Sequence, residues 1–212
     1  MPFNTLIFDL DNTLIDRNRA LRLAMEEWLD TQGYAGHRRR SALDDIMRQD
    51  QWGYTDRTAF GDWLLHTYGA PDTIFKNIIS HIRPDPSILS LLGTAKASFR
   101  LVLATNGGSI HQRAKLRQAQ LESFFHPEAV FISAEMDLEK PDRRFFEKII
   151  NDLRLDPEKT MVIGDHLIND IVPALTCGLS TCWVSYGREG IAGIRPHRVI
   201  MTTTELSQWL LQ

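Results

Sequence analysis

The sequence predicts an α/β fold: a Rossmann-like, doubly wound parallel sheet with a four-helix cap inserted after the first strand. Two observations predict it. Short apolar runs, typical of strands buried on both faces, alternate along the chain with stretches of helical periodicity. One long stretch, residues 17–83, has helical periodicity only and interrupts that alternation directly after the first run.

Five apolar runs are the candidate strands: residues 5–8, 101–104, 130–132, 161–163 and 180–184. Between them, an amphipathic face over 145–153 predicts a helix that packs on the sheet. A looser helix is expected after Gly108, with Ile110, Ala114 and Leu121 as its apolar positions. Parallel strands joined by helices are therefore expected over most of the chain.

The inserted stretch carries four successive apolar helical faces and no convincing strand. Pro84 and Pro86 mark the return to the alternating pattern. The expected organisation is a core domain of residues 1–16 and 84–212 and a helical cap domain of residues 17–83, joined by linkers near residues 15 and 84.

Composition excludes several function classes. With 212 residues, 43% of them hydrophobic, the chain can bury a core without disulfides. The net charge of −3 gives no electrostatic reason to expect a nucleic acid or an anionic membrane as partner. Cys177 and Cys182 form no CxxC pair, which favours a reducing compartment and excludes a thiolate metal site.

The N-terminal apolar run offers no targeting signal. It contains Asp9 and lacks a basic region before it, so a signal peptide is not expected. No apolar stretch approaches the roughly 18 to 20 residues that span a bilayer. We therefore expect a cytoplasmic protein, monomeric or homodimeric, without a membrane partner.

Polar residues follow three of the candidate strands directly. Asp9, Thr105 and Asp165 come immediately after or at the end of an apolar run, with Asp11 and Asp170 a few residues beyond. Ligands bind outside the carboxyl ends of parallel strands, so these side chains are expected in one crevice. Carboxylates gathered there repel one another unless a cation lies between them. Oxygen ligands without cysteines select a hard ion, with Mg²⁺ as the first candidate.

The same edge is equipped for phosphate chemistry. A threonine hydroxyl, the backbone N–H groups of a glycine loop, Lys140 and Mg²⁺ together form a cradle for a phosphate. A carboxylate can attack phosphorus and form an acyl phosphate. A second carboxyl two residues on can protonate the leaving oxygen and then deprotonate the hydrolytic water.

Four segments together resemble the motifs of the haloacid dehalogenase-like superfamily. They are residues 9–13 (DLDNT), 104–107 (ATNG), 140–142 (KPD) and 164–170 (GDHLIND). All four occur in the order of that superfamily and span residues 9 to 170. The insertion between the first two lies where subfamily I carries a helical (C1) cap.

The resemblance implies a role for each motif residue. Asp9 would be the nucleophile and a Mg²⁺ ligand, and Asp11 the general acid/base whose main-chain carbonyl also contacts the metal. Lys140 would neutralise both nucleophile and phosphate. Asp165 would ligate Mg²⁺ directly, and Asp170 would support the ion through water or orient Lys140.

The second motif and one cap residue are the candidate substrate contacts. The resemblance implies that Thr105 and the backbone of the Asn106–Gly107 turn bind the phosphate. Arg17, just after the first motif, is a further candidate for contacting the substrate.

The predicted function is a Mg²⁺-dependent phosphomonoester hydrolase that acts on a small soluble phosphorylated metabolite through an aspartyl-phosphate intermediate. Asp11 favours a phosphatase over a 2-haloacid dehalogenase, where the resemblance places a different residue, typically tyrosine. A phosphomutase uses the same four motifs and stays open. A phosphatase of nucleoside 5′-monophosphates or flavin phosphates is the specific alternative, because Trp52 and Tyr54 of the cap could stack on such a leaving group.

Two other classes that gather carboxylates fit less well. In response-regulator receiver domains the acceptor aspartate follows a later strand, and no helices are inserted after the first. In a glycoside hydrolase Lys140 and the Thr105 loop would have no role. His166 is not expected to be a catalytic group.

Overall fold

A computed structural model of the chain describes residues 3–70 and 74–210. It divides into two compact units: residues 1–15 with 84–212, here called the core unit, and residues 16–83, here called the cap unit. Nowhere in the described ranges is a helix long and apolar enough to cross a membrane.

The core unit is built on a six-stranded sheet in the order β3-β2-β1-β4-β5-β6, and every neighbouring pair is parallel. The strands are β1 (Thr5–Phe8), β2 (Arg100–Thr105), β3 (Val130–Ile132), β4 (Thr160–Gly164), β5 (Ser180–Val184) and β6 (Arg198–Ile200). The α/β prediction and its five candidate strands are confirmed. The sixth strand, β6, was not predicted.

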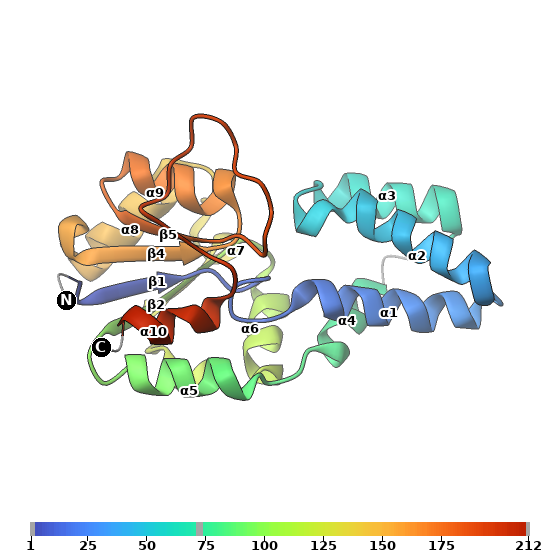
Figure 1. Cartoon of the computed structure of the whole chain (residues 1–212), viewed down its shortest axis with the longest axis horizontal. Coiled ribbons are helices and arrows are strands. Elements are labelled where there is room, and N and C mark those ends of the chain that lie inside the picture. Colours follow the sequence, from blue (N-terminus) through green and yellow to red (C-terminus); the bar gives the residue numbers. More distant parts are fainter. Residues whose placement is uncertain (1–2, 71–73, 211–212) are drawn as a thin grey trace. The chain divides into compact units, whose positions relative to one another are not determined.

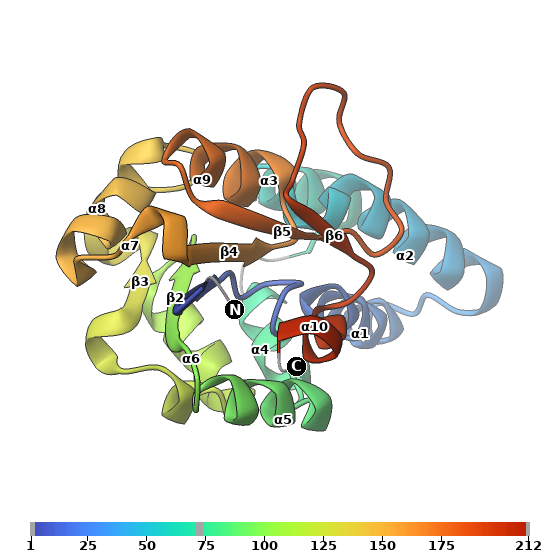
Figure 2. The same ribbon diagram turned by 60° about the vertical axis from the view of Figure 1, so that its left-hand side comes forward.

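Helices cover both faces of this sheet, as the doubly wound prediction requires (Figures 1 and 2). The helices of the core unit are α5 (Pro86–Ala95), α6 (Ser109–Gln118), α7 (Ser133–Met136), α8 (Arg143–Leu153), α9 (Val172–Thr176) and α10 (Ser207–Leu210). In both views α8 and α9 lie on one face, and α5 and α10 lie on the other.

Single helical turns complete the connections of the core unit. They are Glu122–Phe124, Pro127–Ala129, Pro157–Lys159, Leu167–Ile171 and Thr203–Leu206, of which Leu167–Ile171 is a π-helical turn.

One hydrophobic core cluster lies between the sheet and α8. Ile7, Val102 and Val162 come from three neighbouring strands, and Phe145 and Phe146 of α8 pack into the same cluster. Each of these side chains is almost completely buried. The amphipathic face predicted over 145–153 therefore does bind the helix to the sheet.

The helix after Gly108 departs from its prediction. α6 forms, but Ile110 is 82% exposed, and the helix ends before Leu121. Its buried positions are Gln112 and Leu116. The prediction took the side of the helix with Ile110 as the buried face, whereas the face that packs inward carries Gln112.

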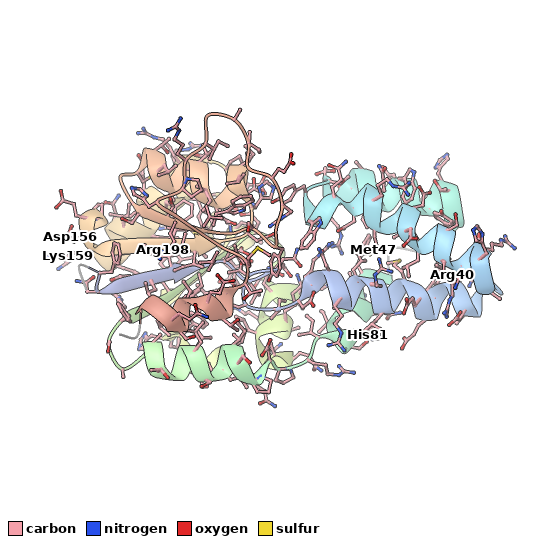
Figure 3. The ribbon with its side chains drawn as sticks, viewed as in Figure 1. Arg40, Met47, His81, Asp156, Lys159 and Arg198 are labelled. Atoms are coloured by element: carbon pink, nitrogen blue, oxygen red, sulfur yellow. The ribbon has the colours of Figure 1, made fainter. Side chains whose placement is uncertain are left out.

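The cap unit is helical, as predicted. Its helices are α1 (Arg17–Thr31), α2 (Gly36–Asp50), α3 (Arg57–Tyr68) and α4 (Ile74–His81), with the single turn Gln51–Gly53 between α2 and α3. Leu21, Met25 and Ile46 are completely buried. A hydrogen bond joins α4 to α1, with 3.1 Å from His81 Nε2 to Glu27 Oε2, and His81 is labelled in Figure 3.

Candidate active site

Asp9 lies directly after β1, at the carboxyl edge of the sheet. Its N–H donates to the carbonyl oxygen of Ile163 in β4 at 2.9 Å, so the ladder continues into this residue. Asp9 is only 8% exposed. A central strand thus holds a carboxylate at a fixed place in the crevice predicted for ligands.

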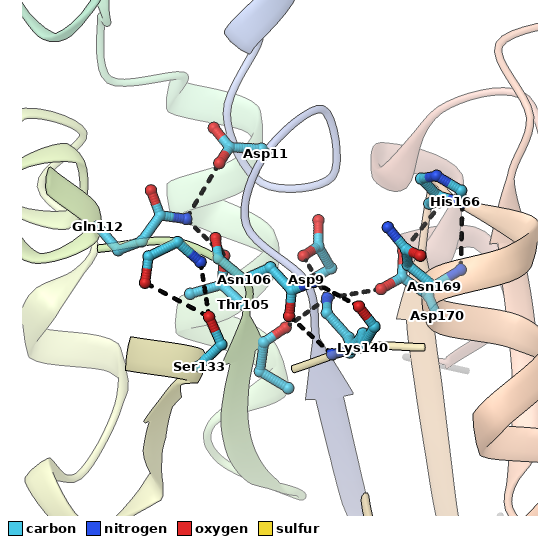
Figure 4. Close-up of polar contacts among 12 residues, drawn as sticks. Asp9, Asp11, Thr105, Asn106, Gln112, Ser133, Lys140, His166, Asn169 and Asp170 are labelled. Carbon is cyan, nitrogen blue, oxygen red and sulfur yellow. Dashed lines mark hydrogen bonds and ion pairs between the residues drawn. The ribbon is translucent and has the colours of Figure 1, made fainter. Parts of the chain in front are cut away.

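The ammonium of Lys140 organises the site. Its Nζ donates to Asp9 Oδ1 at 2.8 Å, to Asp170 Oδ1 at 2.6 Å and to the carbonyl oxygen of Ala104 at 2.9 Å (Figure 4). An ammonium carries three N–H groups, so each has an acceptor. Lys140 is therefore locked between β1, β2 and the segment after β4.

The backbone of Lys140 is fixed as well. The Asn106 side chain donates to the Lys140 carbonyl oxygen at 2.7 Å and accepts from the Lys140 N–H at 2.9 Å. This double hydrogen bond ties the loop after β2 to the loop that carries the lysine. The amide of Asn106 thus positions Lys140.

Three buried carboxylates form a group that could hold a metal ion. Asp9, Asp165 and Asp170 each offer one oxygen, and these oxygens lie within 4.8 Å of one another. Hard oxygen donors of this kind suit Mg²⁺. The donor set therefore fits the predicted cofactor.

Burial acts against the charges of this group. It raises the pKa of Asp9 to about 7, although the Lys140 ammonium opposes the rise, and it raises the pKa of Asp165 well above its usual range. Burial also acts to lower the pKa of Lys140, but Asp170 and Asp9 outweigh it, so that pKa is raised. A divalent cation would favour the ionised carboxylates, and this is a second reason why the group fits Mg²⁺.

Asp170 is held from both sides. Its Oδ2 accepts the N–H of His166 at 3.0 Å, while Oδ1 faces Lys140. A Cβ on Gly164 would lie 2.4 Å from Asp170 Oδ2, closer than nonbonded atoms approach. The glycine of the fourth motif is therefore required so that the carboxylate can pack against the backbone at the end of β4.

His166 acts as a helix cap. Its Nδ1 accepts the N–H groups of Ile168 and Asn169, both at 3.1 Å, at the start of the π-helical turn. Burial lowers the pKa of His166 to about 4. The neutral imidazole thus caps the turn that carries Asp170.

The Asp11 carboxylate belongs to a separate cluster. Lys115 Nζ lies 2.8 and 2.6 Å from its two oxygens, and Gln112 Nε2 donates to Asp11 Oδ2 at 3.0 Å. The same Gln112 nitrogen lies 2.6 Å from Thr105 Oγ1. Thr105 is buried at the end of β2, so α6 links the first and second motifs (Figure 4).

The comparison with protein families identifies this arrangement. Residues 6–184 match the family model described as haloacid dehalogenase-like hydrolase. The chain belongs to this family. The resemblance carried by the four motifs is therefore confirmed.

The chain is similar in sequence to phosphatases from several organisms. Pyrimidine 5′-nucleotidase YjjG of Escherichia coli is 29% identical over 145 residues, which cover 67% of this chain and 64% of that protein, less than two thirds of its length. Glyceraldehyde 3-phosphate phosphatase of Pyrococcus abyssi is 24% identical over 211 residues, covering 86% of this chain and 82% of that protein.

A solved structure shares the hydrolase fold across both units. The HAD-hydrolase YfnB of Bacillus subtilis, crystallised with magnesium, has a TM-score of 0.78 at 24% identity. The match covers 99% of each chain.

Sequence reasoning missed two residues that hold Asp165 in this hydrolase. Arg188 Nη2 donates to the Asp165 carbonyl oxygen at 2.8 Å and lies 3.2 Å from its Oδ2. Trp183 Nε1 donates to the same carbonyl oxygen at 2.9 Å. Both contacts form because β5 lies beside β4 in the sheet. In the sequence, the only sign of these residues was that Trp183 lies in the fifth apolar run and Arg188 lies shortly after it.

Gln112, Lys115 and Ser133 were also missed. Ser133 Oγ accepts the N–H of Gly107 at 2.9 Å, and Gly107 has a φ of 132° that suits glycine. In this structure that N–H is therefore directed to Ser133. A phosphate contact of Gly107 stays a prediction.

Arg17 lies at the start of α1, in the cap unit. Its guanidinium forms a buried ion pair with Asp50, with 2.7 Å from Nη2 to Oδ1. Asp50 Oδ2 also accepts the N–H of Gly53 at 2.8 Å, so the pair holds the turn between α2 and α3. The contact between Arg17 and substrate stays a prediction.

Proposed function

We propose that this hydrolase is a Mg²⁺-dependent phosphomonoesterase acting on a small phosphorylated metabolite. The observation that carries the proposal is the buried cluster in which Lys140 joins Asp9 to Asp170 beside Asp165. A carboxylate held in this way is oriented for nucleophilic attack and lies within a ligand set for a hard cation.

The chemistry follows from two carboxylates with different surroundings. An oxygen of Asp9 attacks phosphorus, and the bond from phosphorus to the leaving oxygen breaks while Asp11 donates a proton to that oxygen. Water then attacks the aspartyl phosphate and gives its proton to Asp11. Inorganic phosphate leaves, and the Asp9 carboxylate is restored.

Lys140, Thr105 and the metal ligands support both steps. Lys140 holds Asp9 in place and balances negative charge that grows on the phosphoryl oxygens. The Thr105 hydroxyl donates to a phosphoryl oxygen. Asp9, Asp165 and Asp170 would hold Mg²⁺, which would supply further positive charge at the phosphoryl group.

The relatives support a phosphomonoester as substrate. Two of them are named for removing phosphate from pyrimidine nucleotides and from glyceraldehyde 3-phosphate. Both are small molecules with one phosphoryl group on an alkyl oxygen. We expect the same class of substrate here.

A nucleoside 5′-monophosphate or a flavin phosphate is the more specific candidate. Trp52 and Tyr54 are each 37% exposed in the segment between α2 and α3. Gln51, Trp52 and Gly53 all have positive φ, and the Arg17–Asp50 pair braces this turn. Two half-exposed aromatic rings on a braced turn suit stacking on a heterocyclic base.

The first experiment measures inorganic phosphate release from a panel of phosphorylated metabolites, with Mg²⁺ or with EDTA. Turnover should require Mg²⁺ and fall at least about 10³-fold in Asp9→Asn, because that variant lacks the nucleophile. If turnover survives in Asp9→Asn, Asp9 is not the nucleophile. Isomerisation of a sugar phosphate without phosphate release would identify a phosphomutase. Halide release from a 2-haloacid would identify a dehalogenase.

Specificity is tested in the cap. Trp52→Ala and Tyr54→Ala should raise KM for nucleoside monophosphates about tenfold while leaving p-nitrophenyl phosphate turnover unchanged, because each ring supplies on the order of 1–3 kcal/mol of stacking. Unchanged nucleotide turnover in both variants would exclude the aromatic subsite.

A further inference from the structure

We propose that Gln112 and Lys115 are the positioning residues of the general acid/base Asp11, and that Gln112 couples Asp11 to the phosphate-binding hydroxyl of Thr105. The proposal rests on the phosphomonoesterase function above. It assigns a role to one face of α6 that none of the four motifs contains.

The geometry places both residues on the same side of one helix. Gln112 and Lys115 are three residues apart on α6, a spacing that puts side chains on one helical face. Together they make three contacts of 2.6 to 3.0 Å with the Asp11 carboxylate. Asp11 follows β1 by three residues, so without such partners its side chain would have several rotamers.

The amide of Gln112 also sets the direction of the Thr105 hydroxyl. One amide nitrogen carries two N–H groups, which suits one donor for Asp11 and one for Thr105. Because Thr105 Oγ1 accepts from Gln112, its own hydrogen points elsewhere. The contact from Thr105 Oγ1 to the Asn106 carbonyl oxygen is long, at 3.4 Å, so this hydrogen can turn to a phosphoryl oxygen.

Gln112 itself is held firmly. It is 2% exposed, and a Cβ on Gly107 would lie 3.2 Å from its Cγ and Cδ. The turn at Gly107 thus packs directly on the glutamine side chain. A buried amide of this kind is costly unless its donors are used, and Asp11 and Thr105 use them.

The consequence is a defined dependence on the leaving group. A poor leaving group such as an alkoxide needs a proton from Asp11 as its bond to phosphorus breaks, whereas p-nitrophenolate leaves without one. Loss of Asp11 positioning should therefore slow alkyl phosphates selectively. The quantity kcat/KM isolates this effect, because it covers only the steps up to departure of the leaving group.

The experiment compares Gln112→Met with the matched control Gln118→Met, which makes the same substitution at an exposed position of α6. The substrates are p-nitrophenyl phosphate and the best alkyl phosphate of the panel. For Gln112→Met we expect kcat/KM to fall about 10²-fold on the alkyl phosphate and less than about tenfold on p-nitrophenyl phosphate. The control should match the parent protein on both.

Two further measurements distinguish a lost positioning role from a general loss of folded protein. Lys115→Met should show the same selective loss, and Lys115→Arg should restore most of the alkyl phosphate activity because it keeps a donor cation. Inorganic phosphate should inhibit Gln112→Met more weakly than it inhibits Gln118→Met, because the Thr105 hydroxyl is no longer directed.

The outcomes separate the two proposals. Equal losses on both substrates, or no loss, would overturn the positioning role while the phosphatase function stands. If the parent protein releases no phosphate from any ester, the phosphatase function fails, and the positioning role fails with it.

Discussion

Two lysine–carboxylate clusters lie at the carboxyl edge of the same sheet, and they differ in exposure. Lys140 with Asp9 and Asp170 is buried, with side-chain exposures of 3%, 10% and 2%. Lys115 with Asp11 is partly open, at 14% and 26%. The two aspartates of the first motif are two residues apart, yet each belongs to a different cluster.

This difference matches what the proposed mechanism requires of each aspartate. A buried ion pair is costly to break, because removing one partner leaves a charge with little water around it. A partly exposed pair is screened and is broken at lower cost. In the proposed mechanism Asp9, as the nucleophile, would lie in a fixed cluster, while Asp11, as the group that releases and accepts a proton, would lie in one that can open.

The largest effect is expected when the buried cluster loses its cation. Lys140→Met should lower phosphatase activity about 10²–10³-fold and the free energy of unfolding by about 3–5 kcal/mol, because Asp9 and Asp170 stay buried without their partner. Phosphate release in the presence of Mg²⁺ measures the activity, and urea denaturation in EDTA measures the free energy of unfolding.

The control for Lys140→Met is Lys159→Met. Lys159 lies 3.3 Å from Asp156 in an exposed pair near the start of β4, and both are labelled in Figure 3. That variant should change stability by less than about 1 kcal/mol. If both variants lose the same small amount, burial does not distinguish the two clusters as argued.

A smaller effect is expected from crowding the buried cluster without changing its charge. Gly164→Ala places a methyl group 2.4 Å from Asp170 Oδ2, so the carboxylate must shift. We expect about tenfold weaker Mg²⁺ activation and a loss of about 1–3 kcal/mol of stability.

Gly93→Ala is the matched control for that substitution. Gly93 lies inside α5, and the added Cβ would meet only Phe124 at an ordinary 3.9 Å. Alanine is favoured there by about 0.5–1 kcal/mol. Unchanged Mg²⁺ activation in Gly164→Ala would show that Asp170 can shift without weakening Mg²⁺ binding.

The smallest effect concerns pH and metal together. The pKa of Asp9 is about 7 in the fold and 3.8 in its ordinary state, so between these values the folded protein binds a proton that the unfolded chain does not. This contribution to stability is present at low pH and is lost as the pH rises through 7. Mg²⁺ competes with that proton, so its stabilisation should grow with pH.

Thermal unfolding with and without Mg²⁺ checks the sign. The rise in Tm on adding Mg²⁺ should be several degrees larger above the raised pKa of Asp9 than well below it, and Asp165→Asn should abolish most of it. An equal rise at both pH values would place Mg²⁺ away from Asp9 and Asp165.

Much of the fold was predictable because buried parallel strands leave a continuous apolar signal. β6 lacks that signal: it has three residues, and its first two, Arg198 and Val199, are exposed at the edge of the sheet. α6 misled the prediction for the opposite reason. Its inward face includes Gln112, whose polarity hides its burial, while the apolar Ile110 faces solvent.

The sequence by itself determined which groups are present at the carboxyl edge of the sheet. Asp9, Thr105 and Asp165 each stand at the end of a strand, and parallel strands end at one edge whatever their order. Only the tertiary structure decided how these groups pair. Hydrogen bonds such as Lys140 to Asp9 and Gln112 to Asp11 join residues more than a hundred positions apart, so no local pattern encodes them.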